Sequence, residues 1–223
     1  MYLYDFITNK QLKQKNNIKG DLIVMTKRIF KLLLGNTIAS FGITCLIKSG
    51  LGCFSVTAAN IALANWFCIT VGISGMILEL IMLTIATRMG EGIGVTSIVN
   101  ATYGSILIDV FNLILPTGTW MVFGLVIAPI GWSLMGKAGL GDTGSNILMN
   151  ALLKKTKKSI KLIRGIQESV LLIVGFLGAR NQVTFFTLIL TLGLGYLLEF
   201  EYKLLKYNPS KVKHSFLIKG KNK

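Results

Sequence analysis

The sequence predicts an all-α, polytopic membrane protein with about six spanning helices and two short helices that enter the bilayer without crossing it. Mean hydropathy is +0.63, and 15% of the 223 residues are charged, whereas soluble domains carry about 25%. Three runs, residues 49–78, 110–136 and 181–198, contain no Asp, Glu, Lys or Arg. Since a helix needs about 20 apolar residues to cross a membrane, these runs are long enough.

A short block that occurs twice predicts an internal duplication. Lys48-Ser-Gly-Leu-Gly52 returns 89 positions later as Lys137-Ala-Gly-Leu-Gly141. The same shift pairs other residues: Gly35 with Gly124, Gly42 with Gly131, and Glu79 with Glu168. We therefore expect two membrane repeats of about 89 residues each.

Apolar segments give the expected spans, at residues 29–47, 71–87, 96–115, 120–136, 160–177 and 183–205. Two further segments, 53–70 and 142–153, follow the Gly-Leu-Gly turns. As a helix, the second reaches about 18 Å, which is too short for a hydrocarbon core of about 30 Å. If neither segment crosses, each repeat has three spans and the repeats are inverted. If both cross, there are eight spans and parallel repeats; the short length favours inversion.

The duplication and the charge distribution divide the chain into four parts. Residues 1–26 form a polar, basic extension, 27–116 the first repeat, 117–205 the second and 206–223 a basic tail. Met25, followed by Thr-Lys-Arg, offers an alternative start, which would make residues 1–24 an extension. The extension is expected to be mobile.

The net charge of +15 comes mostly from three basic clusters, near the two termini and at residues 154–164. Basic segments flanking apolar spans remain on the cytoplasmic side, so both termini are expected there. The run Lys154–Lys158 and the termini are expected to bind anionic lipid. Nucleic-acid binding is not expected, because no aromatic or base-reading residues are interleaved with the lysines.

The residues do not suggest an enzyme, a metal site or a cofactor. The one histidine, His214, lies in the basic tail, which removes His-based triads and HExxH zinc sites. Cys45, Cys53 and Cys68 have no zinc-ligand spacing and are expected to be small core residues.

Two acidic residues inside apolar segments are the leading site candidates, because a charge at the bilayer centre costs about 2.5–3.5 kcal/mol on insertion scales. Arg164 precedes Glu168 by four residues, which predicts an ion pair near the cytoplasmic end with a snorkelling arginine. Glu79 has no such neighbour. It is expected either to pair with Lys48 or Lys137, or to serve as a substrate or proton site.

The Gly-Leu-Gly turns precede residues that favour helix starts, so a half helix is expected to begin after each turn. Two such N-termini with unpaired amides suit an anionic group, although glycine turns that only pack helices have the same sequence. The predicted substrate site comprises Lys48, Gly50, Gly52, Ser55, Glu79, Lys137, Gly139, Gly141, Asp142, Asn146, Arg164 and Glu168.

The chain resembles the YczE/YyaS/YitT-like group of bacterial integral membrane proteins between Lys27 and Leu205. The residues that carry the resemblance are Gly42 to Gly52, Gly92-Ile-Gly94, Ile108-Asp109, Arg164 with Glu168, and Gly175-Phe-Leu-Gly178. The group usually places Pro-x-Asp after the glycine turn, whereas this chain has Ser55-Val-Thr57 and Gly144-Ser-Asn146. The resemblance implies a multi-pass protein of the bacterial cytoplasmic membrane and implies no reaction.

Two functions fit these patterns. A small-solute transporter or permease would place Glu79 and Glu168 in one midplane cavity at the repeat interface. A membrane scaffold or accessory protein would instead have a filled midplane and an exposed small-residue strip that docks a partner or another copy. An intramembrane enzyme is the weakest alternative, because no nucleophile–base pair is evident in a span.

Overall fold

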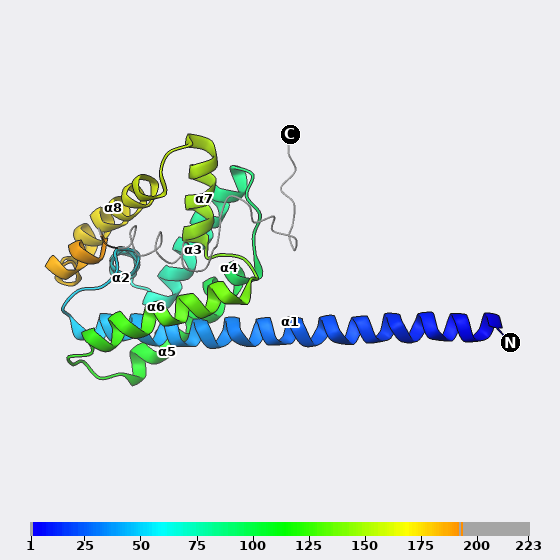
Figure 1. The fold of residues 1–223 in the computed structure, drawn as a ribbon. Coiled ribbons are helices and arrows are strands. Elements are labelled where there is room, and N and C mark those ends of the chain that lie inside the picture. The colour runs from blue at the N-terminus through cyan, green and yellow to red at the C-terminus, as the bar shows by residue number, and fades with distance from the viewer. Residues whose placement is uncertain (1, 192, 194–223) are drawn as a thin grey trace.

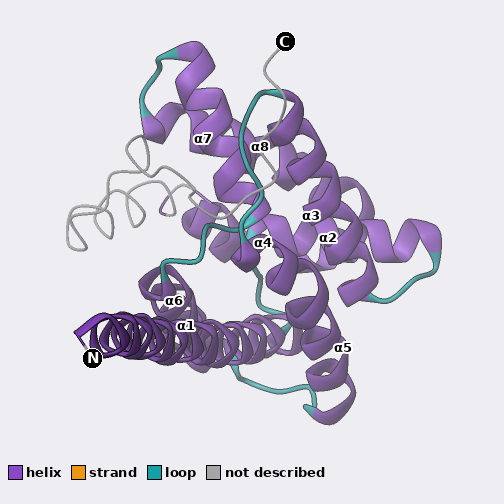
Figure 2. Ribbon diagram, turned by 90° about the vertical axis from the view of Figure 1, so that its right-hand side faces the viewer, coloured by secondary structure: helices purple, strands orange, loops and turns teal. Residues whose placement is uncertain are grey.

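The computed structural model describes residues 2–191 and 193, with side chains described from residue 22 onward. Within this part of the chain every element is helical, which confirms the all-α prediction. The helices in order are α1 (Tyr2–Ser49), α2 (Ser55–Phe67), α3 (Val71–Arg88), α4 (Val95–Val99), the π-helical turn η1 (Asn100–Gly104), α5 (Ser105–Ile114), α6 (Met121–Ala138), α7 (Gly144–Thr156), α8 (Ile160–Gly178) and the 3-10 turn η2 (Arg180–Gln182). Figures 1 and 2 show their arrangement.

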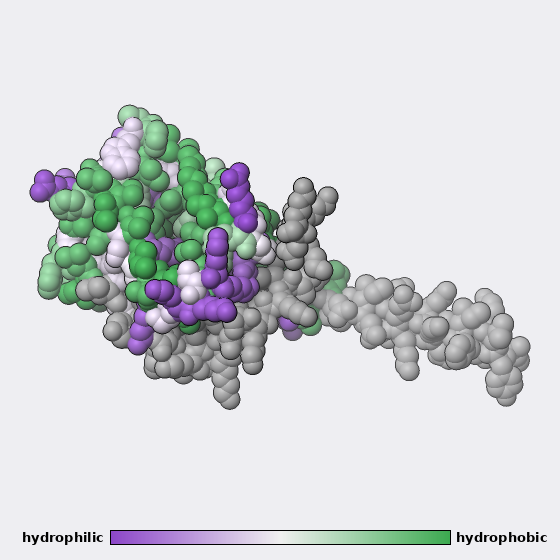
Figure 3. Space-filling view, turned by 90° about the horizontal axis from the view of Figure 1, so that it is seen from above, coloured by the Kyte–Doolittle hydropathy of each residue, from purple (hydrophilic) through white to green (hydrophobic). Residues whose placement is uncertain are grey.

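Among the described residues, four helical segments are long and apolar enough to cross a membrane: Leu22–Ser49, Val71–Arg88, Val95–Ile114 and Met121–Ala138. They match four of the six predicted spans. Many large apolar side chains on them are exposed, among them Ile77, Leu80 and Phe123, and Figure 3 shows apolar residues over much of one face. Exposed apolar surface of this extent is typical of a lipid-facing protein.

The other two predicted spans are not among these four. α8 has 19 residues but carries Lys161, Arg164 and Glu168, which makes it less apolar. The predicted span at residues 183–205 lies mostly outside the described residues, as does the basic tail. Residues 2–26 of the expected extension form the first part of α1, which is helical from Tyr2 (Figure 1). Residues 2–19 contain no Gly or Pro, and Lys, Gln and Leu are good helix formers.

Helices α1 and α6 form the most extensive helix pair of the described chain (Figures 1 and 2). A Cβ atom added to Gly35 would lie 2.8 Å from the carbonyl oxygen of Gly131, and one added to Gly124 would lie 2.8 Å from that of Gly42. Early residues of one helix therefore meet late residues of the other, so the helices are antiparallel. Glycine allows this close backbone approach because it has no side chain.

The two short helices pack on helices of the other half of the chain: α2 on α8, and α7 on α3. Gly175 of α8 lies against Ala58 of α2, and Leu83 and Ala86 of α3 cluster with Ile147 of α7. α2 and α7 contain 13 residues each, or about 20 Å of helix. Both are therefore too short to cross a bilayer in a straight path.

The predicted first short segment, residues 53–70, is longer than α2 because the chain turns sharply after Phe67. Cys68 adopts a left-handed conformation with φ 53°, and Thr70 then caps α3 by accepting a hydrogen bond from the amide of Ile73. Asp109 of α5 supports this cap. Its carboxylate accepts hydrogen bonds from the Gly72 amide at 2.7 Å and the Thr70 hydroxyl at 2.5 Å. The carboxylate of Asp109 therefore holds the start of α3 against α5.

The α1–α6 contact predicts opposite effects for the same substitution at two glycines. In Gly42→Ala, the new Cβ lies 2.5 Å from the backbone nitrogen of Ala128, so we expect a loss of about 1–3 kcal/mol from overpacking. In Gly165→Ala on α8, the methyl group meets no atom within 4 Å. The higher helix propensity of alanine should therefore raise the free energy of unfolding by up to about 1 kcal/mol. Thermal unfolding in detergent measures both. Equal melting temperatures for the two variants would contradict the close packing of α1 on α6.

Candidate functional site

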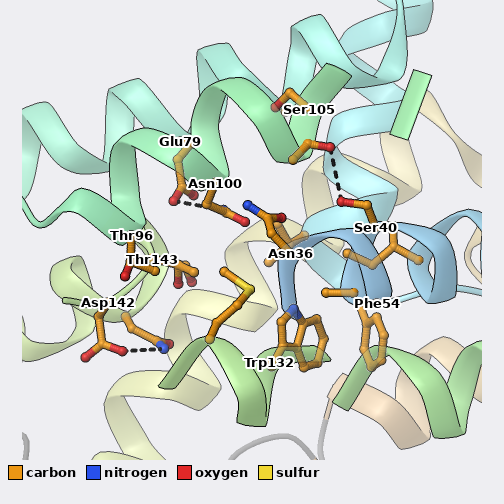
Figure 4. A pocket seen from close by; sticks show the side chains of 18 of the residues that line it. Asn36, Ser40, Phe54, Glu79, Thr96, Asn100, Ser105, Trp132, Asp142 and Thr143 are labelled. Carbon is orange, nitrogen blue, oxygen red and sulfur yellow. Dashed lines mark hydrogen bonds between the residues drawn. The ribbon is translucent and has the colours of Figure 1, made fainter. Parts of the chain in front are cut away.

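A cavity of about 260 Å³ lies at the centre of the described helices (Figure 4). Its walls come from α1, α2, α3, the α4–α5 segment, α6 and the start of α7, with Arg164 contributed by α8. One side is apolar, with the rings of Phe54 and Trp132 packed 5.0 Å apart between centroids. The other side is polar, and its residues include Asn36, Thr57, Asn60, Glu79, Thr96, Asn100, Asp142, Thr143, Ser145 and Asn146. A few polar groups set in an apolar pocket are typical of a small-molecule site.

Glu79 lies on the wall of this cavity and is 6% exposed. Its Oε1 atom accepts hydrogen bonds from the Gly144 amide at 2.5 Å and from Asn100 Nδ2 at 3.2 Å. Gly144 is the first residue of α7, so the carboxylate occupies the N-terminus of this short helix. The positive end of a helix dipole and its unpaired amides favour a carboxylate in this position.

Glu168 has an equivalent position at the start of α2. The hydroxyl of Ser55, the first residue of α2, donates a hydrogen bond to Glu168 Oε2. Arg164 Nε lies 2.7 Å from Glu168 Oε1, which confirms the predicted ion pair. Arg164 does not snorkel as expected. It is buried and its Nη1 donates to Ser145 Oγ at 2.9 Å and Asn146 Oδ1 at 3.3 Å, because those acceptors lie inside the protein.

The starts of the two short helices also differ from expectation. α2 begins at Ser55 and α7 at Gly144, within two residues of the predicted starts, but neither cap residue, Phe54 or Thr143, makes a side-chain capping bond. Instead, Glu168 of α8 contacts the first residue of α2, and Glu79 of α3 contacts the first residue of α7. The α7 amide expected to bind an anionic ligand is thus already occupied by Glu79.

The π-helical turn η1 brings Asn100 to the cavity. It interrupts the segment between α4 and α5, at Asn100–Gly104, and π-turns inside α-helices frequently occur at functional sites. Asn100 donates to Glu79, and Gly104 at the end of the turn packs against the amide of Asn36, so closely that a Cβ would lie 2.6 Å from Asn36 Oδ1. The turn therefore aligns two amide side chains along one wall of the cavity, as Figure 4 shows.

Several buried polar atoms of residues that line the cavity have no hydrogen-bond partner among the described residues. They are Asn36 Nδ2, Asn60 Oδ1 and Thr96 Oγ1. Asn36 and Thr96 are 1% and 2% exposed, so bulk water does not reach them freely. Leaving such a group unsatisfied costs about 1–3 kcal/mol. Buried polar atoms without partners next to a cavity can be satisfied by water, an ion or a polar solute in that cavity.

Half of the twelve predicted site residues line this cavity, and half do not. Glu79, Gly139, Gly141, Asp142, Asn146 and Arg164 line it, whereas Lys48, Gly50, Gly52, Ser55, Lys137 and Glu168 do not. The hydrogen bonds of Glu79 go to Asn100 and Gly144, so neither expected lysine pairs with it. Lysines at the polar ends of α1 and α6 remain near water, which is the lower-energy position for an ammonium group.

The glycine turns have a structural role that fits the packing alternative. Gly50, Gly52, Gly139 and Gly141 all have positive φ, at 63°, 126°, 65° and 109°. L-residues rarely adopt this conformation, so glycine is favoured at these positions. The carbonyl between each glycine pair is also bound: Leu51 accepts from the Thr184 hydroxyl at 2.5 Å, and Leu140 from the Thr96 amide at 3.3 Å.

The residues of α1 that line the cavity were not predicted from the sequence. Asn36 and Ser40 lie four residues apart on the face that lines it, with Ala39 and Ile43 beside them. Two polar residues at helical spacing inside an apolar span were a usable signal. It was overlooked because Gly35 and Gly42 on the same helix indicated packing. Trp132 was also missed, since an aromatic residue in a span has many roles.

A second missed contact joins Glu91 to the basic run after α7. Glu91 is buried and its Oε1 lies 2.7 Å from Lys154 Nζ. Lys154 is therefore paired within the protein, while Lys155, Lys157 and Lys158 are exposed. The ion pair joins the turn after α3 to the last turn of α7, the helix that α3 packs against.

The buried Arg164–Glu168 pair predicts strong coupling between two substitutions. Glu168→Gln keeps an acceptor for Ser55 but leaves Arg164 unpaired, so we expect a loss of about 3–5 kcal/mol. The double variant Arg164→Met, Glu168→Gln removes both charges of this pair. Much of the lost free energy of unfolding should therefore be recovered. Thermal unfolding of Arg164→Met, Glu168→Gln and the double variant in detergent measures the coupling. Additive losses would show that Arg164 and Glu168 do not depend on each other.

Comparison with known proteins places the chain in a membrane protein family. It is similar to "Uncharacterized membrane protein YczE" of Bacillus subtilis (strain 168), with 28% identity over 177 residues, covering 74% of this chain and 81% of that protein. No solved structure matches the chain. The model of a family of unknown function, DUF6198, matches residues 26–203.

This match covers both glycine turns and the two buried acids, and it supports the predicted YczE-like resemblance. The apolar helices and the relative agree that this is a membrane protein. The chain thus belongs to the DUF6198 family of YczE-like membrane proteins.

Proposed function

We propose that this protein is a small-solute permease built from two inverted repeats, with the central cavity as its substrate site. The observation that carries this proposal is the cavity itself, which lies where the two short helices begin and holds buried polar atoms without partners. Interrupted or short helices that meet at a central site are a recurrent feature of secondary transporters with inverted repeats.

Paired contacts support the duplication. Glu79 and Glu168 are 89 residues apart, and so are their partners Ser55 and Gly144. Each acid binds the first residue of a short helix from the other repeat. The carbonyls of Leu51 and Leu140 are likewise 89 residues apart, and each accepts a hydrogen bond from the other repeat. An exchange of this kind relates two copies of one unit by a two-fold axis.

The direction of α1 and α6 supports inversion. These helices occupy the same place in the two repeats, and their glycine contacts are antiparallel. Parallel repeats with eight spans would orient them in the same direction. The antiparallel packing therefore favours six spans, with α2 and α7 entering from opposite faces without crossing.

The alternative is a scaffold that docks another membrane protein through glycine-rich helix faces. This function requires a filled centre and an exposed strip of small residues. The contacts of Gly35, Gly42, Gly124 and Gly131 are instead internal, between α1 and α6, and the centre contains a cavity. Both observations favour the permease.

The orientation follows from the basic residues. Lys27, Arg28 and Lys31 are exposed near the start of the first span, and Lys155, Lys157 and Lys158 are exposed after α7. We place both clusters, and with them both termini, on the cytoplasmic side of the bacterial cell membrane. Anionic lipid would bind the exposed lysines of the 154–158 run, with Lys154 already engaged by Glu91.

A permease must expose its site to each side of the membrane in turn. In a background without Cys45, Cys53 and Cys68, we would place single cysteines at Thr57 and Thr143, which line the cavity from α2 and α7. A membrane-impermeant thiol reagent, applied to right-side-out and inside-out vesicles, should label both positions from both sides. A cysteine at Ala62, buried in the core outside the cavity, provides the control and should react from neither side.

Labelling of Thr57→Cys and Thr143→Cys from one side only would contradict the permease. Labelling from one side would show that the cavity opens to only one side of the membrane. Absence of labelling from either side would contradict it too and would favour the scaffold.

A further inference from the structure

Glu79 is an acidic residue of the cavity wall that forms no ion pair with the described residues. Of the described residues that line it, Glu79, Asp142 and Arg164 are ionisable. Arg164 forms a 2.7 Å ion pair with Glu168, an acid outside the cavity wall, so its positive charge is already compensated. The repeat-equivalent acids therefore differ: Glu168 pairs with a cation four residues away on its own helix, whereas no described cation forms an ion pair with Glu79. A buried carboxylate in this situation requires a positive partner or a proton.

The geometry of Glu79 leaves one oxygen available to a ligand. Both of its hydrogen bonds, from Gly144 and Asn100, are made to Oε1. Oε2 forms no hydrogen bond or ion pair with the described residues. In Figure 4 the side chain points into the cavity, toward Asn100 and the region of Thr96 and Thr143.

Acceptors without partners lie near Glu79. Asn60 packs against Gly75, one helical turn before Glu79, and its Oδ1 has no partner. Thr96 precedes Asn100 by one turn, and its Oγ1 has no partner. Together with Oε2, these atoms present several acceptors to one cavity, which suits a ligand group that donates hydrogen bonds. An –NH₃⁺ group has three such donors and carries the missing positive charge.

We infer that the cavity binds a small primary ammonium compound, with its –NH₃⁺ group on Glu79 Oε2 and its apolar part against Phe54 and Trp132. The inference rests on the proposed function and names the substrate class of the same cavity. The volume of about 260 Å³ limits the ligand to a small molecule.

The test compares propylammonium with propan-1-ol, which has the same number of heavy atoms and no charge. Binding to the purified full-length protein in detergent is measured by isothermal titration calorimetry. Propylammonium should bind about tenfold more tightly, the factor expected for one charge-assisted hydrogen bond. Tetramethylammonium has the charge without N–H donors and should bind more weakly than propylammonium.

Two variants locate the ammonium group. Glu79→Gln keeps the shape and the acceptor for Gly144 and Asn100, and should abolish the preference for propylammonium over propan-1-ol. Asp109→Asn, the same change at the carboxylate that caps α3 outside the cavity wall, should retain it. Circular dichroism and gel filtration check that both variants are folded. If Glu79→Gln does not fold, the three ligands on the native protein still decide the question.

Several results would overturn the inference. They are equal affinity for propylammonium and propan-1-ol, equal affinity for tetramethylammonium, an unchanged preference in Glu79→Gln, or no binding of any probe. Tight binding of propan-1-ol alone would exclude the ammonium class and still support a solute site. Two-sided labelling at Thr57 and Thr143 tests the permease separately, so the two proposals can fail independently.

Discussion

A carboxylate removed from water must be compensated by hydrogen bonds, by an opposite charge or by a proton, and this requirement determines how the two halves of the protein meet. Glu79 and Glu168 each find their partner at the first residue of a short helix from the other half of the chain. Neither short helix has a side-chain cap of its own. Glu79 therefore caps α7 through the Gly144 amide, whereas Glu168 is bound by the hydroxyl of Ser55 at the start of α2.

The close contact between α1 and α6 and the two acid–helix contacts together create the cavity. Glycines bring the axes of α1 and α6 close together on one side. On the other side, α7 packs on α3 and α2 on α8. The space between these pairs is not filled by large side chains: Asn36, Ser40, Thr57, Asn60 and Asn100 leave room and provide polar groups. Small polar residues here weaken the packing, and a bound solute would compensate for that loss.

The sequence predicted the helical class, four of the spans and the shortness of α7, because length and hydropathy decide these features locally; α2 is shorter than the predicted segment 53–70. It also located Glu79, Glu168 and Arg164, because charged residues inside apolar runs are conspicuous. It did not predict their partners. Gly144 and Ser55 are brought to Glu79 and Glu168 by packing between distant segments, and no local pattern specifies that packing. Lys48 and Lys137 were expected as partners of Glu79 because the duplication places them at equivalent positions, and the sequence did not show that they stay at the helix ends.

The cavity wall shows the same limit. Asn100 faces Glu79 because a π-turn changes the rotation of the helix at that point, and the sequence carries no clear signal for such a turn. Asn36 and Ser40 were visible as polar residues four positions apart, yet their role depends on α6 covering the glycine face of the same helix. The difference between the two halves of the chain, with Arg164 beside Glu168 and no cation beside Glu79, was visible in the sequence. Only the structure shows that Glu79 lines the cavity and that Glu168 does not.

The central claim is that the repeats are inverted, and the sidedness of two positions tests it most directly. Leu51, just after α1, is exposed, and so is Lys137 in the last turn of α6. We would place single cysteines at these positions in the cysteine-free background and label them from each face of sealed vesicles with an impermeant reagent. Inverted repeats place Leu51→Cys outside and Lys137→Cys on the cytoplasmic side. Labelling of both from the same face would establish parallel repeats and contradict the account.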